Sequence, residues 1–341
     1  MFGMVSYFCL EKKLDMLYLN TMNFNSNKLD KATVTITGGC GFIGSFLVKF
    51  LVSTAVKKII VIDHLKYGSK NRLPDDKRIE VHKLDLAEVN EVALEKVMKG
   101  THFLFHLAAE KHNQSFDTPA DVFEANIAGF YRLMNAAKSI GVKKVVFSSS
   151  LYVYGATTKD QFSESDIPRP HTLYGLSKHF GEELLHYNFK QFGIDYVAIR
   201  YFFVYGPEQY NGTGYKSVIV KNFERLCNGL APIIKGDGKQ SLDYIYIDDI
   251  ATFTIKAMTS TATDITLNFG SEKAYTINEL TKKMIAIAGS NLDPVYEEKD
   301  ITHNTKRVCS AVLAKEQLGF EETVGIDEGL KRTYNWVKHN K

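Results

Sequence analysis

A tyrosine and a lysine four residues apart are the pair whose types and spacing most directly suggest chemistry. Tyr174 and Lys178 lie in the segment YGLSK, and residues four apart project from the same face of a helix. A phenol with a pKa of about 10 is a poor base at neutral pH, but an adjacent ammonium stabilises its phenolate form. The pair could therefore act as a general acid and base. On its own, such a pair is more often part of a solvated helix face.

Three consecutive serines close the apolar segment upstream of this pair. Ser148, Ser149 and Ser150 follow the run KVVF, and the carboxyl end of a strand is where open α/β sheets bind ligands. Serines at such a place could also do no more than satisfy local backbone groups. Together with Tyr174, Lys178 and a glycine-rich loop near the N-terminus, they predict a site for hydride transfer.

That loop is TVTITGGCGFIG, which places Gly38, Gly41 and Gly44 between a predicted strand and a predicted helix. Glycine is needed there for a tight turn, for close approach of the backbone to a pyrophosphate, and for packing of the helix on its strand. The helix N-terminus then supplies N–H donors and a positive partial charge. A glycine-rich turn without a ligand is the alternative, and the strand-loop-helix context argues against it.

An acidic residue at the end of the next strand supports a dinucleotide. The run IIVIDH ends in Asp63, nineteen residues after Gly44, where a carboxylate can accept hydrogen bonds from both ribose hydroxyls. The same carboxylate would repel a 2′-phosphate, so the sequence predicts NAD rather than NADP. Asp85 and Leu86, after the third predicted strand, are then expected to flank the adenine.

The elements that must position these residues alternate regularly from Ala32 onward. Short β-branched runs alternate with longer helical stretches, which predicts a parallel sheet covered on both faces. The fold class is α/β, a Rossmann-type doubly wound parallel sheet with a smaller C-terminal α/β substrate lobe. The predicted strands are 33–37, 58–63, 79–82, 102–106, 144–148 and 196–200, and the predicted helices are 43–55, 90–98, 119–140 and 174–192.

The chain divides unequally along its length. We interpret residues 1–31 as an N-terminal extension and 32–205 as the NAD-binding Rossmann-type domain. Beyond Tyr205 the regularity weakens, although helices are predicted at 217–228, 276–288 and 327–338 and a strand-like run at 244–247. Residues 206–243 and 271–341 are expected to form the substrate-binding lobe, with the chain returning to the main sheet within 244–270.

Composition excludes several classes of protein. The 341 residues include 42 Lys+Arg and 39 Asp+Glu, interspersed rather than clustered, so we expect no nucleic-acid partner. No uncharged apolar run approaches the roughly 20 residues that cross a bilayer, so we expect no membrane association. The four cysteines are scattered without a C-x-x-C pair, which argues against a zinc site and a disulfide framework and favours the reducing cytoplasm.

Further ordered motifs identify a resemblance. Besides TGGCGFIG, SSSLYVYG and YGLSK, the chain contains HLAA (106–109), RYFFVYGP (200–207) and GDGKQSLDYIYIDD (236–249). From Ala32 to nearly the C-terminus it resembles an extended short-chain dehydrogenase/reductase of the nucleotide-sugar epimerase/dehydratase group. The resemblance implies a tightly held NAD, a nucleotide-sugar substrate and a homodimer. It also implies that Tyr174 is the acid/base, that Lys178 binds the nicotinamide ribose, and that Ser150 is hydrogen-bonded to the reacting sugar hydroxyl.

The resemblance assigns further residues to the cofactor. Lys111 matches a position that reaches the cofactor phosphates in galactose-type epimerases, Tyr201 matches a residue beside the nicotinamide, and Asn126 matches a helix asparagine near the site. The expected cofactor-binding set is Gly38, Gly41, Phe42, Ile43, Gly44, Asp63, Asp85, Leu86, Leu107, Ala108, Ala109, Lys111, Asn126, Ser148, Tyr174, Lys178 and Tyr201. The expected substrate-binding set is Ser150, Tyr152, Phe203, Lys239 and Leu242.

Departures from the family pattern narrow the reaction. Family 4,6-dehydratases carry an Asp-Glu pair after the serine or threonine, because elimination of water needs a further acid and base. Leu151 and Tyr152 stand there in this chain, and the glutamate that UDP-glucuronate decarboxylases usually keep is also missing. Oxidation at one carbon and return of the hydride remain, and a keto sugar that turns over between the two steps gives the 4-epimer.

Other departures concern the substrate's diphosphate. Phe203 replaces the family's usual asparagine, Leu242 replaces an arginine that clamps the diphosphate, and Glu297 stands where another arginine is expected. Each lost charge-assisted hydrogen bond would cost about 1.5–3 kcal/mol unless replaced. The candidate replacements, which could equally be ordinary surface charges, are Lys221, Lys239, Lys306 and Arg307.

Three hypotheses follow. The first is an NAD-dependent nucleotide-sugar 4-epimerase that forms a transient 4-keto sugar and returns the hydride from bound NADH. The second is a related NAD-dependent dehydrogenase/reductase, dehydratase or decarboxylase that acts on a different sugar. The third is a regulatory protein that senses NAD without turnover. Intact Tyr174 and Lys178 argue against the third, since a sensor has no need of a tuned phenol.

Overall fold

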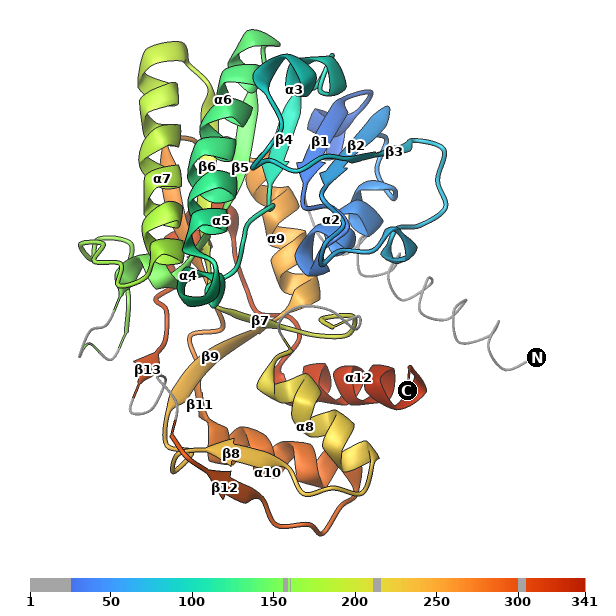
Figure 1. Cartoon of the computed structure of the whole chain (residues 1–341), viewed down its shortest axis with the longest axis vertical. Helices are drawn as coiled ribbons and strands as arrows, with labels where there is room; N and C mark the ends of the chain where they lie inside the picture. Colours follow the sequence, from blue (N-terminus) through green and yellow to red (C-terminus); the bar gives the residue numbers. More distant parts are fainter. Residues whose placement is uncertain (1–25, 156–158, 160, 211–215, 300–304, 341) are drawn as a thin grey trace.

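Seven parallel strands form the main sheet of the computed structural model, which describes residues 26–155, 159, 161–210, 216–299 and 305–340 (Figure 1). Their spatial order is β10-β6-β5-β4-β1-β2-β3, and every neighbouring pair is parallel. The predicted doubly wound parallel sheet is thereby confirmed. The strands are β1 (Thr33–Thr37), β2 (Lys58–Asp63), β3 (Ile79–Lys83), β4 (Phe103–His106), β5 (Lys144–Ser150), β6 (Asp195–Tyr201) and β10 (Ile265–Phe269).

Helices cover both faces of this sheet, because its central strands are apolar on both sides. One face packs against α2 (Phe42–Leu51), α9 (Ile247–Thr259) and α11 (Val312–Leu318). The opposite face packs against α3 (Glu91–Val97), α6 (Gly129–Ser139) and α7 (Leu173–Phe192).

The helix predicted over 119–140 is interrupted. It consists of α5 (Pro119–Phe123), a π-helical turn η3 (Glu124–Ala128) and α6, and the short α4 (Gln114–Asp117) precedes it. A π turn takes more residues per turn than an α-helix, and such turns are frequent at functional sites. Asn126 is carried by this turn.

A smaller lobe holds two further sheets and three helices, below the main sheet in Figure 1. In the four-stranded sheet, β9 (Ser241–Tyr246) pairs with β7 (Phe203–Tyr205), β11 (Ala274–Thr276) and β13 (Lys306–Arg307). The second sheet pairs β8 (Ile233–Lys235) with β12 (Val295–Glu297). The helices are α8 (Val218–Cys227), α10 (Ile277–Ala288) and α12 (Ile326–His339), and they share a third apolar core with β9.

The chain returns to the main sheet through α9 and β10, both of which lie within the expected range 244–270. Residues 244–246 belong to β9 of the smaller lobe, and Ile247 begins α9, which packs on the main sheet. The returning strand is β10, whose Ile265 lies opposite Val197 of β6. The sequence of β10, ITLNF, alternates apolar and polar residues as a strand does, but no strand was predicted there.

The fold also begins before Ala32, the predicted boundary. Leu29, at the end of the 3-10 turn η1 (Ser26–Leu29), is fully buried in the core beneath α9. Lys28 donates to the backbone oxygen of Ser260 at 2.8 Å. Residues 26–31 are thus packed on the main sheet rather than outside the fold. Two other short turns, η2 (Lys70–Arg72) and η4 (Leu151–Tyr154), border the site described below.

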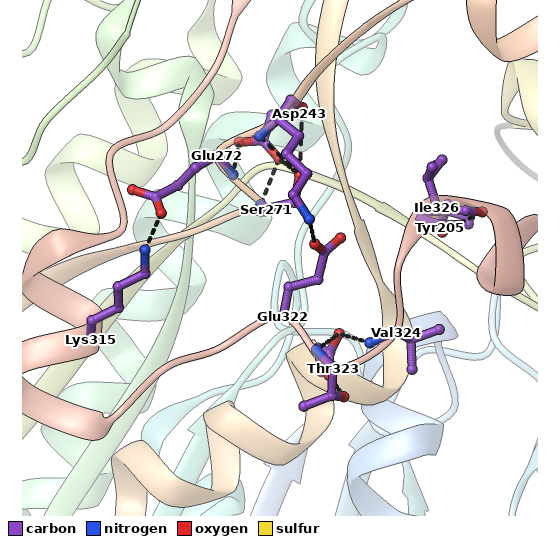
Figure 2. Close-up of polar contacts among 11 residues, drawn as sticks. Tyr205, Asp243, Ser271, Glu272, Lys315, Glu322, Thr323, Val324 and Ile326 are labelled. Carbon is purple, nitrogen blue, oxygen red and sulfur yellow. Dashed lines mark hydrogen bonds and ion pairs between the residues drawn. The ribbon is translucent and has the colours of Figure 1, made fainter.

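Buried carboxylates connect the smaller lobe to the main sheet (Figure 2). Asp243 of β9 accepts hydrogen bonds from the backbone N–H groups of Ser271 at 2.6 Å and Glu272 at 3.0 Å, just after β10. Asp249 of α9 likewise accepts from the backbone of Thr323 and Val324, each at 3.1 Å. Hydrogen bonds to charged acceptors in buried surroundings are strong, so these contacts fix the C-terminal segment. Among the described residues, no helix has the length and apolarity needed to span a membrane.

Candidate active site

A pocket lies at the carboxyl edge of β1, β2, β4 and β5, the position expected for a ligand of an open parallel sheet. All predicted cofactor-binding residues line it except Asn126 and Tyr201. The structure therefore brings together the glycine-rich loop, Asp63, the HLAA segment, Ser148, Tyr174 and Lys178.

The glycine-rich loop forms a cradle that only a residue without a side chain can make. A Cβ on Gly44 would lie 2.2 Å from the carbonyl oxygen of Gly38, which no real Cβ tolerates. Gly41 caps α2 without a side-chain hydrogen bond, so the first N–H groups of the helix lack a capping side chain and face the pocket as anion donors. The loop fits the pyrophosphate of a dinucleotide.

Asp63 is 5% exposed at the end of β2 and points its carboxylate across the loop. It accepts from the backbone N–H groups of Cys40 at 3.0 Å and Leu65 at 2.8 Å. Both oxygens keep acceptor capacity for a ribose hydroxyl. Asp63 thus both orders the loop and presents a negative charge to the pocket.

Several residues that line the pocket were not predicted, among them some that closely follow Asp63. Hydrogen bonds with Asp63 and Glu110 raise the pKa of His64 to about 9, so its imidazole carries a proton at neutral pH. Lys111 lies 5.0 Å from the ring centroid of Tyr67. His64 could have been predicted as a pocket residue, because it directly follows Asp63 at the end of the strand. The additional pocket-lining residues are Ile62, His64, Tyr67, Gly68, Arg72, Leu84, Glu110, Ala125 and Gln209.

Helix α7 brings Tyr174 and Lys178 to the end of β5. Thr172 caps the helix by accepting from the backbone N–H of Gly175 at 3.1 Å. One helical turn after Lys178, a Cβ on Gly181 would lie 2.4 Å from the ring of Phe147, so glycine is what lets α7 approach β5 closely. The Lys178 ammonium then reaches the Ser148 carbonyl oxygen at 2.6 Å. It lies 5.6 Å from the ring centroid of Tyr174.

Burial opposes the charged form of both side chains. It raises the pKa of Tyr174 to about 12, although a hydrogen bond with Ser150 acts in the opposite direction. It lowers the pKa of Lys178 to about 7, although the negative charge of Glu182 acts to raise it. Groups that are displaced from their ordinary pKa and gathered at a strand end are typical of proton-transfer sites.

A buried ion pair beneath Lys178 was not predicted. Glu182 accepts from Arg200 Nε at 2.9 Å and Nη2 at 2.7 Å, and from Ser149 Oγ at 2.5 Å. Burial would raise the pKa of Glu182, but the hydrogen bonds from Arg200 outweigh it and hold that pKa below its usual value. The signal was the spacing: Tyr174, Lys178 and Glu182 follow one another at intervals of four along one helix face.

Two predicted cofactor residues do not line the pocket: Asn126 lies beside it, and Tyr201 lies in the core. Asn126 is buried, accepts from the backbone N–H of Glu110 at 2.8 Å, and donates to the Glu110 carbonyl at 3.0 Å and to Ser177 Oγ at 3.2 Å. It therefore joins the loop after β4 to α7. Tyr201 lies in the core on the α9 side, with its hydroxyl 2.8 Å from Thr254. Strand residues alternate between faces, so Arg200 points to α7 and Tyr201 to α9.

Tyr152 lies in a group of rings beside Tyr174. Its ring is stacked on His112, with centroids 3.9 Å apart, and meets Tyr174 edge-on at 5.9 Å. The guanidinium of Arg307 lies 5.0 Å from the Tyr152 centroid on the smaller lobe's side. Burial, and then the charge of Arg307, lower the pKa of His112 to about 4. His112 is therefore neutral at pH 7.

The other predicted substrate residues lie farther from Tyr174 along the smaller lobe. Phe203 begins β7 and packs against Tyr244, with ring centroids 5.8 Å apart. Leu242 is 8% exposed in the core of the smaller lobe. The side chain of Lys239 is 80% exposed and lies 3.6 Å from Asp237. The structure does not bring these three residues into the pocket that holds Tyr174.

A family model and known proteins match this chain over most of its length. The model of the NAD dependent epimerase/dehydratase family matches residues 34–270. The chain is 30% identical over 310 residues to a putative UDP-glucose 4-epimerase of Methanocaldococcus jannaschii, covering 90% of this chain and 99% of that protein.

Two solved structures share the fold. A UDP-glucose 4-epimerase of Thermotoga maritima with UDP-glucose is 31% identical with a TM-score of 0.84, over 90% of this chain and 99% of that one. A UDP-N-acetylglucosamine 4-epimerase of Methanobrevibacter ruminantium, in complex with UDP-N-acetylmuramic acid, is 32% identical with a TM-score of 0.85, over 92% and 100% of the two chains.

Proposed function

Because the chain belongs to the NAD dependent epimerase/dehydratase family, an enzyme family whose cofactor is NAD, we propose that it is a nucleotide-sugar 4-epimerase. Membership alone leaves open whether the reaction is epimerisation or dehydration. The observation that carries the proposal is an intact proton-transfer set, Ser150, Tyr174 and Lys178, next to a position where an aromatic residue replaces a second acid and base. Its similarity to the 4-epimerases described above supports the same reaction.

The cofactor would be held by the glycine cradle, Asp63 and Lys178. The unblocked N–H groups of α2 suit the pyrophosphate, and the Asp63 carboxylate suits the ribose hydroxyls of NAD and disfavours a 2′-phosphate. When bound, NAD supplies a hydride acceptor that can return the hydride to the same carbon. The Lys178 ammonium, 2.6 Å from the Ser148 carbonyl oxygen, keeps donors available for a ribose hydroxyl.

Tyr174 would remove the proton from the sugar's 4-hydroxyl and later give it back. Its hydrogen bond with Ser150 favours the phenolate, and the positive charge of Lys178 does the same. Ser150 Oγ accepts from the backbone N–H of Tyr152 at 3.3 Å, so the hydroxyl is held by the turn η4. This arrangement suits a hydroxyl that bridges the sugar oxygen and the phenol.

Epimerisation rather than elimination follows from Leu151 and Tyr152. Leu151 is 3% exposed, and an apolar side chain offers no proton. Tyr152 carries a phenol where dehydratases carry a carboxylate, and its ring contacts His112 and Tyr174. With Tyr174 as the acid/base, the 4-keto sugar can be reduced on its other face. Elimination of water would need a further base to take the C5 proton and an acid to protonate the departing 6-hydroxyl, and Leu151 and Tyr152 do not supply that carboxylate pair.

A panel of UDP-, dTDP-, GDP- and CDP-sugars, followed by NMR with the purified protein, tests the reaction. We expect one or more pairs of 4-epimers to interconvert without net formation of NADH. A 4-keto-6-deoxy product, loss of carbon dioxide, or one NADH per sugar would instead indicate the dehydratase, decarboxylase or dehydrogenase alternative.

A variant pair tests the assigned site. Tyr174→Phe deletes only the acid/base oxygen, so it should abolish turnover while NAD still binds. Tyr187→Phe makes the same change at a tyrosine that is 53% exposed on the same helix and should leave turnover unchanged. Normal turnover by Tyr174→Phe would remove the basis for the site.

The enzyme is also proposed to act as a homodimer in the cytoplasm. Large apolar side chains are half exposed on α5, α6 and α7, which stand side by side in Figure 1: Phe123, Tyr131, Leu176 and Tyr187. Leu176 and Tyr187 lie three turns apart on one face of α7. A second copy of this chain is the occupant that covers equivalent helices symmetrically.

A further inference from the structure

Arg307 is an arginine whose charge the described structure does not neutralise. Arg78, Arg200 and Arg332 each form an ion pair with a carboxylate. Three other half-buried arginines, Arg72, Arg132 and Arg225, donate to backbone carbonyl oxygens. Arg307 is half-buried, and within the described ranges its guanidinium contacts the Tyr152 ring and has no hydrogen bond or ion pair. A partly desolvated charge without a counterion is costly for a fold to keep. It therefore indicates a group that arrives with the substrate.

The backbone that carries Arg307 is fixed on two sides. In β13, Arg307 lies directly opposite Leu242 of β9. Just after it, the N–H of Cys309 donates at 3.2 Å to the buried carboxylate of Asp243, which Figure 2 shows beside Ser271 and Glu272. Phe162 pairs with the same segment, through hydrogen bonds of 2.8 Å to Val308 and 2.7 Å from Ser310. The guanidinium is thus presented from a rigid position.

The Arg307 guanidinium lies toward the part of the site that contains Tyr174. Arg307 covers one part of the Tyr152 ring, and the same ring contacts His112 and the acid/base Tyr174. His112, with its pKa lowered to about 4, adds no charge at pH 7. The Nδ1 atom of His112 is buried without a hydrogen-bond partner, so a polar ligand group beside Arg307 would also find a ring nitrogen to contact.

The register with Leu242 explains why this arginine is needed. A leucine at that position of β9 cannot hold an anion, whereas Arg307 occupies the paired position on the neighbouring strand, and the backbones of neighbouring strands lie about 5 Å apart. We propose that Arg307 binds an oxyanion of the substrate next to the reacting sugar. This rests on the proposed nucleotide-sugar function. The oxyanion is either the diphosphate, which every such substrate has, or a carboxylate on an acidic sugar, and both suit a bidentate guanidinium.

The test measures binding rather than turnover, so it does not depend on the reaction being epimerisation. Affinities of UDP, UDP-glucose and UDP-glucuronate for the NAD-loaded protein are measured by calorimetry at one fixed ionic strength. They are compared between wild type, Arg307→Gln, Arg307→Lys and Lys282→Gln, an exposed lysine on α10 that serves as the matched control. Melting temperature and NAD affinity show whether each variant is folded.

Arg307→Gln should weaken binding by about 10-fold or more, the loss expected for one charge-assisted hydrogen bond. Arg307→Lys should recover part of it, and Lys282→Gln should bind as wild type does. Equal losses for all three ligands would identify the diphosphate as the anion. A loss confined to UDP-glucuronate would identify the carboxylate.

Other results overturn the inference. Affinities within twofold of wild type for a folded Arg307→Gln would show that the arginine only packs on Tyr152. Failure of the wild-type protein to bind any of the three UDP ligands or any sugar nucleotide of the NMR panel would overturn both this inference and the proposed substrate class. Binding that depends on Arg307 without any epimerisation would refute only the reaction.

Discussion

Replacing Glu182 by glutamine should destabilise the protein severely, because it leaves a buried arginine without its counterion. Glu182 and Arg200 are 5% and 4% exposed, respectively. The carboxylate accepts two hydrogen bonds from Arg200 and one from Ser149. A glutamine keeps one acceptor oxygen, but its amide places N–H donors against the donors of the guanidinium.

The size of the effect follows from burial. Water cannot reach the abandoned guanidinium, and breaking a buried pair by removing one partner costs about 3–5 kcal/mol. The neighbouring Glu183 is exposed, and Glu183→Gln should change the free energy of unfolding by less than about 0.5 kcal/mol. The double variant Glu182→Gln/Arg200→Met removes both charges. It should therefore recover most of the loss, since buried pairs are often replaced by apolar residues at little cost.

Urea denaturation followed by far-UV circular dichroism, for all three variants and wild type at pH 7.5, measures these differences. The reasoning would be refuted if Glu182→Gln unfolded within about 1 kcal/mol of Glu183→Gln. It would also fail if the double variant were less stable than Glu182→Gln, because the penalty would then not come from an uncompensated arginine.

Three further predictions concern the cofactor, the buried lysine and the proposed dimer. Gly44→Ala should weaken NAD binding in calorimetry by at least about tenfold, because the new Cβ would lie 2.2 Å from the Gly38 carbonyl oxygen. Gly325→Ala, where a Cβ meets nothing within 4 Å, is the control. Equal NAD affinities of the two variants would contradict the assignment of the glycine-rich loop to the cofactor. Lys178 has its pKa lowered from 10.5 to about 7 in the folded state, so between these values the unfolded chain holds a proton that the folded protein lacks. The free energy of unfolding should therefore rise with pH across that window, and Lys178→Met should flatten the rise; parallel wild-type and variant curves from pH 6 to 10 would count against it. The double variant Phe123→Glu/Tyr187→Glu should be a monomer in light scattering. Val312→Glu is the control, because Val312 is equally exposed but lies on the opposite side of the main sheet, and its mass should not change. An unchanged mass for the double variant would exclude the face formed by α5, α6 and α7 as the dimer interface.

Features that depend on local spacing could be predicted from the sequence. The glycine-rich loop, Asp63 and the Tyr174–Lys178 pair each lie within a single strand-loop-helix or helical segment, where residue type and interval decide the geometry. The alternation of β6 residues between the two faces of the sheet could also have been predicted from the sequence. Val197, Ile199 and Tyr201 share one face of that strand, and the core on that side contains all three. Had this alternation been applied, Tyr201 would have been assigned to the core.

Features that depend on long-range pairing could not be predicted. Nothing in the local sequence of Arg307 indicates that it lies opposite Leu242, because a register between short strands is set by tertiary contacts. The same holds for β10, whose pairing with β6 at the edge of the main sheet joins segments far apart along the chain. The burial of Leu29 likewise depends on contacts with residues far along the chain.

The proposed acid/base function is best understood as a property of three residues on one face of α7. Burial favours a neutral Tyr174, and it lowers the pKa of Lys178 to about 7 although the charge of Glu182 opposes this shift, so neither side chain is fully charged at neutral pH without its neighbour. A phenolate and an ammonium in a poorly solvated site stabilise one another, and each raises the other's tendency to ionise. Glu182, one turn below Lys178, adds a fixed negative charge that favours the ammonium, and Arg200 keeps that carboxylate ionised. The ion pair buried behind the site therefore favours the protonated form of Lys178, which in turn favours a phenolate at Tyr174.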